Sequence, residues 1–177
     1  LNIVKSEDIQ SDAVDSDYSQ LIISEIICDN VKNDCLDLSF SNAQVDNLIA
    51  KNIRDKVISA GESSIINLDY VLASNSEMGI VAKDSSKVLV KLFEAESVKL
   101  PVAAYIKKPE LGPPYVEVTS LDNMLQDYSL ISNDSIVYLG GKKIYGKLES
   151  NKIAKMLYGN LFGVKTVRPW DMKGNIY

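Results

Sequence analysis

From Ser64 onward, apolar and polar residues alternate in short runs, and this two-residue period is the strongest constraint on the fold. A strand places successive side chains on opposite faces, so the alternation predicts half-buried β-strands. Glycine, proline, asparagine and serine separate the runs and supply the turns. The expected strands are residues 66–70, 79–82, 87–93, 98–106 and 161–167, with a hairpin over residues 135–148.

The first third of the chain carries a different pattern. Residues 1–16 are polar and acidic and are expected to form a loose arm. From Asp17, apolar residues recur at three- and four-residue spacing, which predicts a helix that ends between residues 28 and 31. A strand is expected at residues 36–40. The capping-box pair Ser41 and Gln44 then predicts a second helix over residues 42–59.

A third, shorter helix is expected over residues 149–158, where apolar residues again recur at helical spacing. Together these patterns predict an α+β fold, in which N-terminal helical segments pack on a mostly antiparallel β domain. The expected division is a helix/strand domain over residues 1–86 and a β domain over residues 87–177.

Cys28 and Cys35 are the only cysteines, and Asp29, Asn30 and Asp34 between them favour a turn. A loop of this size can bring two Cα atoms within disulfide range. In an oxidising compartment, a bridge would join the end of the first helix to the strand that follows. The alternative is two reduced, half-buried thiols. Two cysteines without histidine do not complete a tetrahedral zinc shell, and their spacing is not that of a redox motif.

The residue types exclude several classes of enzyme. The chain has no histidine, which rules out Ser-His-Asp and Cys-His catalysis as well as histidine-based metal sites. A formal net charge of −5 argues against nucleic-acid binding, and no apolar run is long enough for a membrane helix. Glu110, Glu117, Asp122 and Asp127 cluster in sequence, but surface solvation explains them better than acid–base chemistry. We therefore expect no enzymatic activity, no cofactor and no metal.

Gly140 and Gly141, followed by two lysines, have the composition of a phosphate-binding loop. They lie between two expected strands, however, so no helix N-terminus stands behind them to bind an anion. The interpretation that we favour is the turn of a β-hairpin.

The order of motifs after Val98 resembles the periplasmic flagellar P-ring assembly chaperone family and its SAF, or β-clip, module. That family carries a strand of the type V-x-V-P-V-x-A-R-x-I, then a glycine turn and a D-L pair, and later L-x-G and a second A-x-R-x-I-x-x-G-x-x-I. The corresponding segments here are residues 99–106, 120–122, 156–159 and 164–176. Tyr105 departs from the pattern because it stands where the family has a cation.

The resemblance implies a non-enzymatic periplasmic chaperone with a SAF-like C-terminal half, which binds a flagellar ring or pilus subunit. Such a protein offers its client an apolar surface or an open strand edge. The expected partner-binding residues are Leu100, Val102, Tyr105, Tyr115 and Val116. The alternative function is a structural subunit of a secretion, pilus or viral assembly, located outside the cell or in a virion. A small hydrolase that uses two facing carboxylates is the least favoured class.

Overall fold

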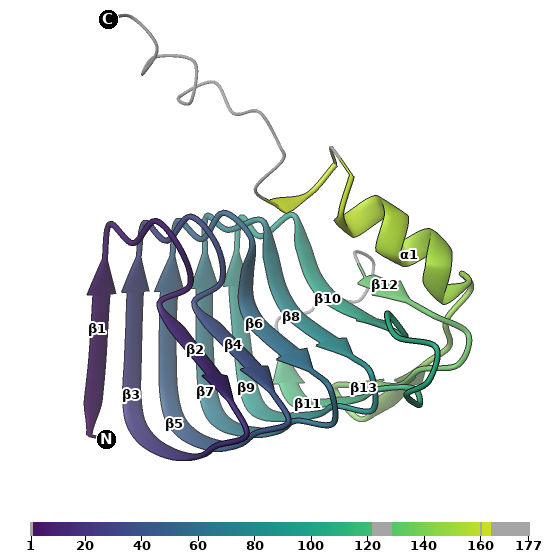
Figure 1. Cartoon of the computed structure of the whole chain (residues 1–177), viewed down its shortest axis with the longest axis horizontal. Helices are drawn as coiled ribbons and strands as arrows, with labels where there is room; N and C mark the ends of the chain where they lie inside the picture. Colours follow the sequence, from purple (N-terminus) through teal and green to yellow (C-terminus); the bar gives the residue numbers. More distant parts are fainter. Residues whose placement is uncertain (1, 122–128, 160, 164–177) are drawn as a thin grey trace, which may run out of the picture.

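A coil of 22 or 23 residues repeats from residue 3 to residue 105, and the next coil is longer. Gln20 pairs with Asn42 in one sheet and Val14 pairs with Leu36 in another, so each partner lies 22 residues further on. Each coil adds one strand to each sheet, and the coils stack into a parallel β-solenoid (Figure 1). The computed structural model describes residues 2–121, 129–159 and 161–163.

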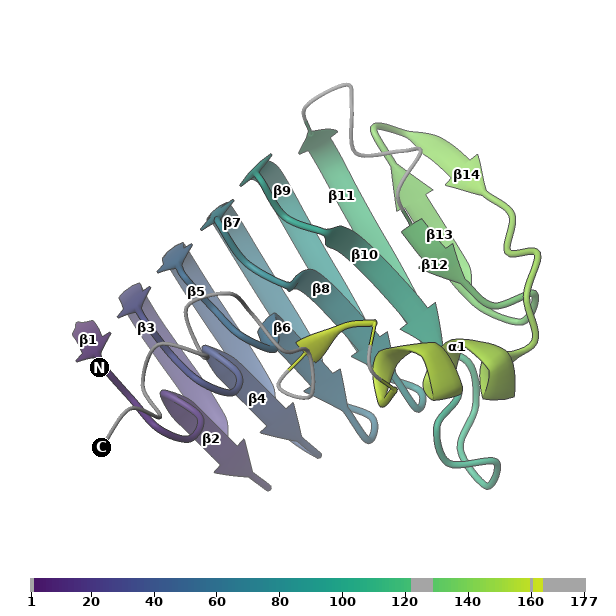
Figure 2. The same ribbon diagram turned by 90° about the horizontal axis from the view of Figure 1, so that it is seen from above.

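The two sheets differ in length. The large sheet has eight strands, in the spatial order β1 (Ile3–Glu7), β3 (Gln20–Asp29), β5 (Asn42–Lys51), β7 (Ile65–Ser74), β9 (Lys87–Glu96), β11 (Tyr115–Leu121), β13 (Ile136–Leu139) and β14 (Lys142–Ile144). The small sheet has six, in the order β2 (Val14–Asp17), β4 (Leu36–Ser39), β6 (Lys56–Gly61), β8 (Met78–Lys83), β10 (Leu100–Tyr105) and β12 (Ser129–Ile131). Figure 2 shows the coils stacked from β1 and β2 at one end to β13 and β14 at the other.

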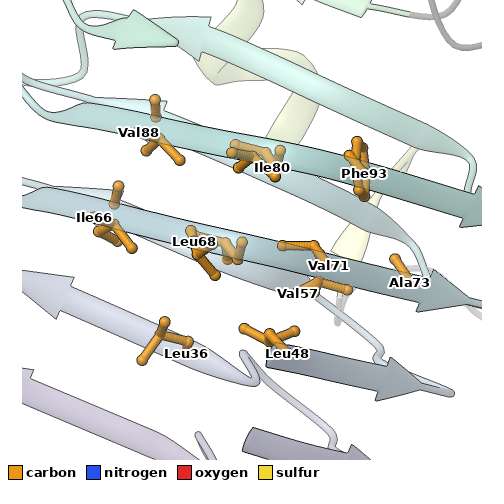
Figure 3. Packing of buried hydrophobic residues seen from close by; sticks show 14 of the residues in the cluster. Leu36, Leu48, Val57, Ile66, Leu68, Val71, Ala73, Ile80, Val88 and Phe93 are labelled. Atoms are coloured by element: carbon orange, nitrogen blue, oxygen red, sulfur yellow. The ribbon is translucent and has the colours of Figure 1, made fainter. Parts of the chain in front are cut away.

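The core lies between the two sheets, and equivalent residues of successive coils stack on one another. In the large sheet Ile66 pairs with Val88, and Val71 pairs with Phe93. All four side chains are fully buried, and Figure 3 shows the two pairs lying side by side. Parallel, in-register pairing therefore turns a sequence repeat into continuous columns of apolar side chains.

The outer face of the small sheet is covered near its C-terminal end. The single described helix, α1 (Ser150–Leu157), packs Ile153 and Leu157 against Met78, Val81 and Leu100. Strands β8 and β10 are consequently buried on both faces, and all residues of β6 are buried as well. The outer face of the large sheet, in contrast, has no such cover among the described residues, and it alternates exposed with buried positions.

Asparagine and aspartate residues form a ladder at the turns that follow the long strands. Asp8, Asn30, Asn52 and Asn75 all have positive φ, a conformation that Asn and Asp tolerate better than other side chains. The Asn52 amide donates to Asp29 at 2.8 Å and its oxygen accepts from Asn75, while Asn30 donates to Asp8. Each turn is thereby tied to the turn of the preceding coil.

The α+β prediction is wrong, because the two long N-terminal helices are strands. The segment from Asp17 forms β3, and residues 42–59 form β5 and the start of β6. The inward residues of β3 are Leu21, Ile23, Ile26 and Cys28, with steps of two, three and two residues. The three-residue step arises because two successive residues, Ser24 and Glu25, both point away from the core. That step imitates the spacing of a helix.

Two further sequence predictions about the N-terminal part and the strand directions are also wrong. The described part of the expected N-terminal arm, residues 2–16, is not loose, because β1 and β2 pair with β3 and β4 and place Val4 and Val14 against the core. The sheets are not mostly antiparallel, since consecutive strands belong to different sheets. Only β13 and β14 pair antiparallel among the described strands.

Several local predictions are confirmed. The strand at residues 36–40 is β4, the strand at 98–106 is β10, and the helix at 149–158 is α1. The hairpin is β13 and β14, joined by Gly140 and Gly141 with φ of 58° and 74°. The final expected strand, residues 161–167, lies largely outside the described residues.

Cys28 and Cys35 form a disulfide, with their Cα atoms 6.0 Å apart. The bridge joins the end of β3 to the residue before β4, so it closes the corner of one coil rather than the end of a helix.

The large sheet continues across residue 87, where the second domain is expected to begin, because β9 starts at Lys87 and pairs with β7. No helix in the described part of the chain is both long and apolar enough to span a membrane.

The ladder predicts that Asn52→Ala lowers the free energy of unfolding by roughly 1–3 kcal/mol, because alanine resists positive φ and loses both amide hydrogen bonds. Asn52→Gly should lose less, since glycine accepts positive φ. Equilibrium denaturation by guanidinium measures both values. The matched control is Asn67→Ala, an exposed mid-strand residue, with an expected change within about 0.5 kcal/mol. Equal losses at positions 52 and 67 would contradict the ladder.

Candidate functional site

Four amide side chains line one end of the exposed face of the large sheet. Gln20 and Asn42 are the first residues of β3 and β5, and Gln44 and Asn67 pair with each other one row further along. All four are exposed and line one shallow groove together with Ile22. None of these four amides has a hydrogen-bond partner among the described residues, so they are available to a ligand. We call them the amide row.

Tyr18 and Phe40 lie beside the amide row, in the turns that lead from the small sheet to the large sheet. Each precedes an amide residue by two positions, Tyr18 before Gln20 and Phe40 before Asn42. Their rings stack with centroids 5.0 Å apart and an angle of 3° between the planes. Tyr18 is 78% exposed and Phe40 is 43% exposed. We call this pair the aromatic platform.

Both residues of the platform have an unfavourable backbone conformation, with φ of 51° at Tyr18 and 49° at Phe40. Eleven described non-glycine residues have positive φ, and eight of them are Asn, Asp or Ser. The other three are Tyr18, Phe40 and Glu62. A bulky residue in this region costs roughly 1–3 kcal/mol, and such strain is concentrated at functional sites. The solenoid therefore retains two exposed rings at positions where asparagine would be less strained.

The opposite end of the same face carries tyrosine–carboxylate pairs. The Tyr70 hydroxyl donates to Glu94, and the Tyr115 hydroxyl donates to Glu117 at 2.6 Å. Lys91 and Asp69, on the same two strands as Glu94 and Tyr70, form an exposed ion pair at 2.7 Å in a shallow groove of about 260 Å³ that Asn67 also lines. The face thus changes from uncharged at the amide row to charged across β7, β9 and β11.

These hydrogen bonds shift the ionisation of the two tyrosines. The bond to Glu94 raises the pKa of Tyr70 to about 12, with smaller contributions from partial burial and from the charge of Glu94. Glu117 acts on Tyr115 in the same way and raises its pKa to about 12. In both cases the protonated phenol is held because ionisation would break the bond and place two negative charges together.

The structure places most of the expected partner-binding residues inside the molecule. Leu100, Val102, Tyr105 and Val116 are at most 3% exposed, because β10 is covered on both faces and Val116 points into the core. Tyr115 is half-buried on the outer face, where Lys87 lies over its ring. Tyr115 is therefore the one of these five whose side chain reaches the open face.

The four carboxylates that cluster in sequence do not gather into one site. Glu117 pairs with Tyr115, and Glu110 is exposed in the loop before β11. Asp122 and Asp127 lie outside the described residues. Within the described ranges, no cluster of three or more potential ligands could hold a metal ion.

The aromatic platform and the amide row are not among the site residues that the sequence predicts. Local spacing places Tyr18 in a helix and Phe40 at the end of a strand, and neither position suggests a site. A comparison of positions 22 residues apart would have found them, since Tyr18-x-Gln20 and Phe40-x-Asn42 are equivalent. The signal is a repeat, which a window of one element does not contain.

Comparison with known proteins leaves the chain without an assigned family: no protein-family model, no curated protein and no solved structure matches it. The case for function consequently rests on the residues and geometry described above.

The tyrosine–carboxylate pairs predict that Tyr70→Phe and Tyr115→Phe each remove one tyrosine that ionises near pH 12. Because these folded-state pKa values lie above the usual 10, the bonds stabilise the fold fully below pH 10. Their contribution is lost as the pH rises through about 12. Ultraviolet absorbance titration of phenolate measures the ionisation. Glu94→Gln should lower the pKa of Tyr70 toward 10; an unchanged titration would show that Glu94 is not its partner.

Proposed function

We propose that this chain is a non-enzymatic binding module that holds a neutral polysaccharide across the aromatic platform and the amide row. The observation that carries the proposal is the pair of stacked, exposed rings kept at positive φ beside four exposed amides that have no hydrogen-bond partner within the described ranges. A folded protein gains nothing in stability from exposing such rings to water. A ligand that covers them explains why they are retained.

The chemistry of the platform suits a sugar ring. The apolar face of a pyranose presents C–H groups, which pack favourably against the electron-rich face of an aromatic ring. Because the two rings stack on each other, the ring faces that can meet a sugar are the outer faces of the stack. Adjacent coils lie about 4.8 Å apart, so the platform can contact an extended chain at successive positions.

The amide row supports an uncharged ligand. Each amide both donates and accepts hydrogen bonds, so Gln20, Asn42 and Gln44 can each bind a pair of neighbouring hydroxyl groups. No described lysine, arginine or carboxylate lines the groove of the amide row. An acidic or basic polymer would find no counter-charge there, whereas a neutral one loses no charge solvation on binding.

The platform predicts that Tyr18→Asn and Phe40→Asn weaken polysaccharide binding about tenfold or more each, roughly 1.5 kcal/mol, by removing the ring contact. The free energy of unfolding should stay the same or rise, because asparagine accepts positive φ. Affinity electrophoresis through gels that contain a soluble glucan, mannan or galactan measures binding. Guanidinium denaturation measures stability.

The matched control is Tyr145→Asn, because Tyr145 is 74% exposed after β14 and lies outside the platform. It should bind like the unaltered chain. Two results would contradict the proposal: no retardation by any neutral polysaccharide, or equal retardation of the Phe40 and Tyr145 variants. A preference for an acidic polysaccharide would argue against the assigned class of ligand.

A second candidate function is the assembly chaperone implied by the sequence resemblance, or its alternative, a structural subunit, and the edge of β1 favours both. β1 pairs with β3 on one side, and no described strand pairs with its other side. Asn2 and Asp8 bond toward β3, so the alternation of a parallel ladder directs the backbone groups of Ile3, Lys5 and Glu7 outward. A partner strand, from a client or a second copy, could bind there.

This candidate predicts concentration-dependent association, or capture of a ring or pilus subunit, that Lys5→Pro abolishes. Proline removes an outward N–H without removing a bond to β3, so the fold should keep its stability. Multi-angle light scattering measures self-association, and a pull-down with purified subunit measures client binding. Lys5→Ala, which keeps the N–H, is the control. A protein that stays monomeric and binds no subunit would contradict this candidate function.

A further inference from the structure

A buried lysine lies between two aspartates at the start of the small-sheet strands. Lys56 Nζ is 3.1 Å from Asp34 Oδ1, 3.2 Å from Asp34 Oδ2 and 2.6 Å from Asp55 Oδ2. The side chains of Lys56, Asp34 and Asp55 are 7%, 3% and 13% exposed. We call these three residues the lysine triad. It takes no part in the ligand-binding face.

The repeat creates the triad, because equivalent positions of neighbouring coils stack. Asp34 lies just before β4, and Lys56, the first residue of β6, lies 22 residues further on. Asp55 is covered by Gly163, where an added Cβ would fall 2.5 Å from Asp55 Oδ1 and 3.4 Å from Met78. The three groups are thus held together in a site with little access for water.

We propose that Lys56 and Asp34 condense to a side-chain amide, a covalent cross-link between two neighbouring coils, with Asp55 transferring the protons. Nζ is nearly equidistant from both oxygens of Asp34, so it lies next to the carboxyl carbon that it attacks. The backbone N–H of Lys56 donates to Asp34 Oδ1 at 2.9 Å and stabilises the charge that develops on that oxygen.

The atoms balance without an added reagent. The bond from Nζ to Cγ of Asp34 forms, and the bond from Cγ to Oδ2 breaks. The ammonium of Lys56 carries three protons, of which one stays on the amide nitrogen. Asp55 accepts the other two in turn from Nζ and passes them to Oδ2, which leaves as water. No oxidation or reduction occurs.

The protonation of the triad sets the rate of this step. Burial raises the pKa of the Asp34 carboxyl to about 7, although Lys56 acts in the opposite direction. Burial alone would lower the pKa of Lys56, but Asp34 and Asp55 outweigh it and raise that pKa. Asp34 is therefore partly protonated at neutral pH, whereas Lys56 stays charged. The free amine is the minor form, so the bond forms slowly and once per molecule.

Intact mass spectrometry of the full chain, reduced at Cys28 and Cys35, tests the proposal. The folded protein should be lighter than its sequence by one water molecule, whereas Lys56→Met and Asp55→Asn should have their full masses. Trypsin should release residues 33–51 joined to residues 55–83, since a cross-linked Lys56 is not cleaved. This joined pair also distinguishes the cross-link from a cyclic imide at Asp34, which loses water within one peptide.

A full mass for the unaltered chain after prolonged incubation in the folded state would overturn the proposal and leave an ordinary ion pair. Loss of water that persists in Lys56→Met would overturn it as well. A cross-link that forms at an unchanged rate in Asp55→Asn would refute the assigned role of Asp55. Circular dichroism of each variant establishes that the fold is retained before its mass is interpreted.

Discussion

The repeating part of this protein depends on parallel pairing between residues 22 or 23 positions apart. Because successive coils pair in register, each side chain lies against its equivalent in the next coil, so chemistry repeated in sequence becomes continuous in space. Apolar positions become the core columns, asparagines become a hydrogen-bonded ladder, and Tyr18 and Phe40 become a stacked pair. A single coil could form none of these, because each needs a neighbour to bury or bond its groups.

The same constraint decides which parts of the fold could be predicted from sequence. The hairpin at Gly140 and Gly141 and the helix α1 are predicted correctly, since each depends on residues close in sequence. The long strands are not, because the inward steps of two, three and two in β3 match a helix within one window. Only comparison of successive coils distinguishes a strand from a helix here. The apolar residues Leu21 and Ile23 recur 22 positions later as Ala43 and Val45, a repeat that a helix would not show.

Departures from the repeat carry the functional information that local patterns lack. Most described non-glycine residues with positive φ are Asn, Asp or Ser, and Tyr18 and Phe40 stand out against them as aromatic residues. Lys56 occupies the position equivalent to Asp12 and Asp34 in the two preceding coils, where the backbone N–H of Asp34 and that of Lys56 each donate to the aspartate of the coil before it. A lysine in that column converts repulsion between stacked aspartates into attraction. The sequence shows which residues are present, whereas the strand-pairing register shows which of them become neighbours in space.

Strand β4 links these two departures. At its start, Cys35 is bonded to Cys28 and Asp34 contacts Lys56, so this end of the strand is fixed both within its coil and to the next one. At its end, four residues later, the chain turns into the strained conformation of Phe40. A strained turn persists only where its surroundings determine it, and a short strand anchored at one end leaves the turn little freedom to relax. The disulfide at Cys35 and the ion pair at Asp34 therefore limit how far the turn at Phe40 can relax.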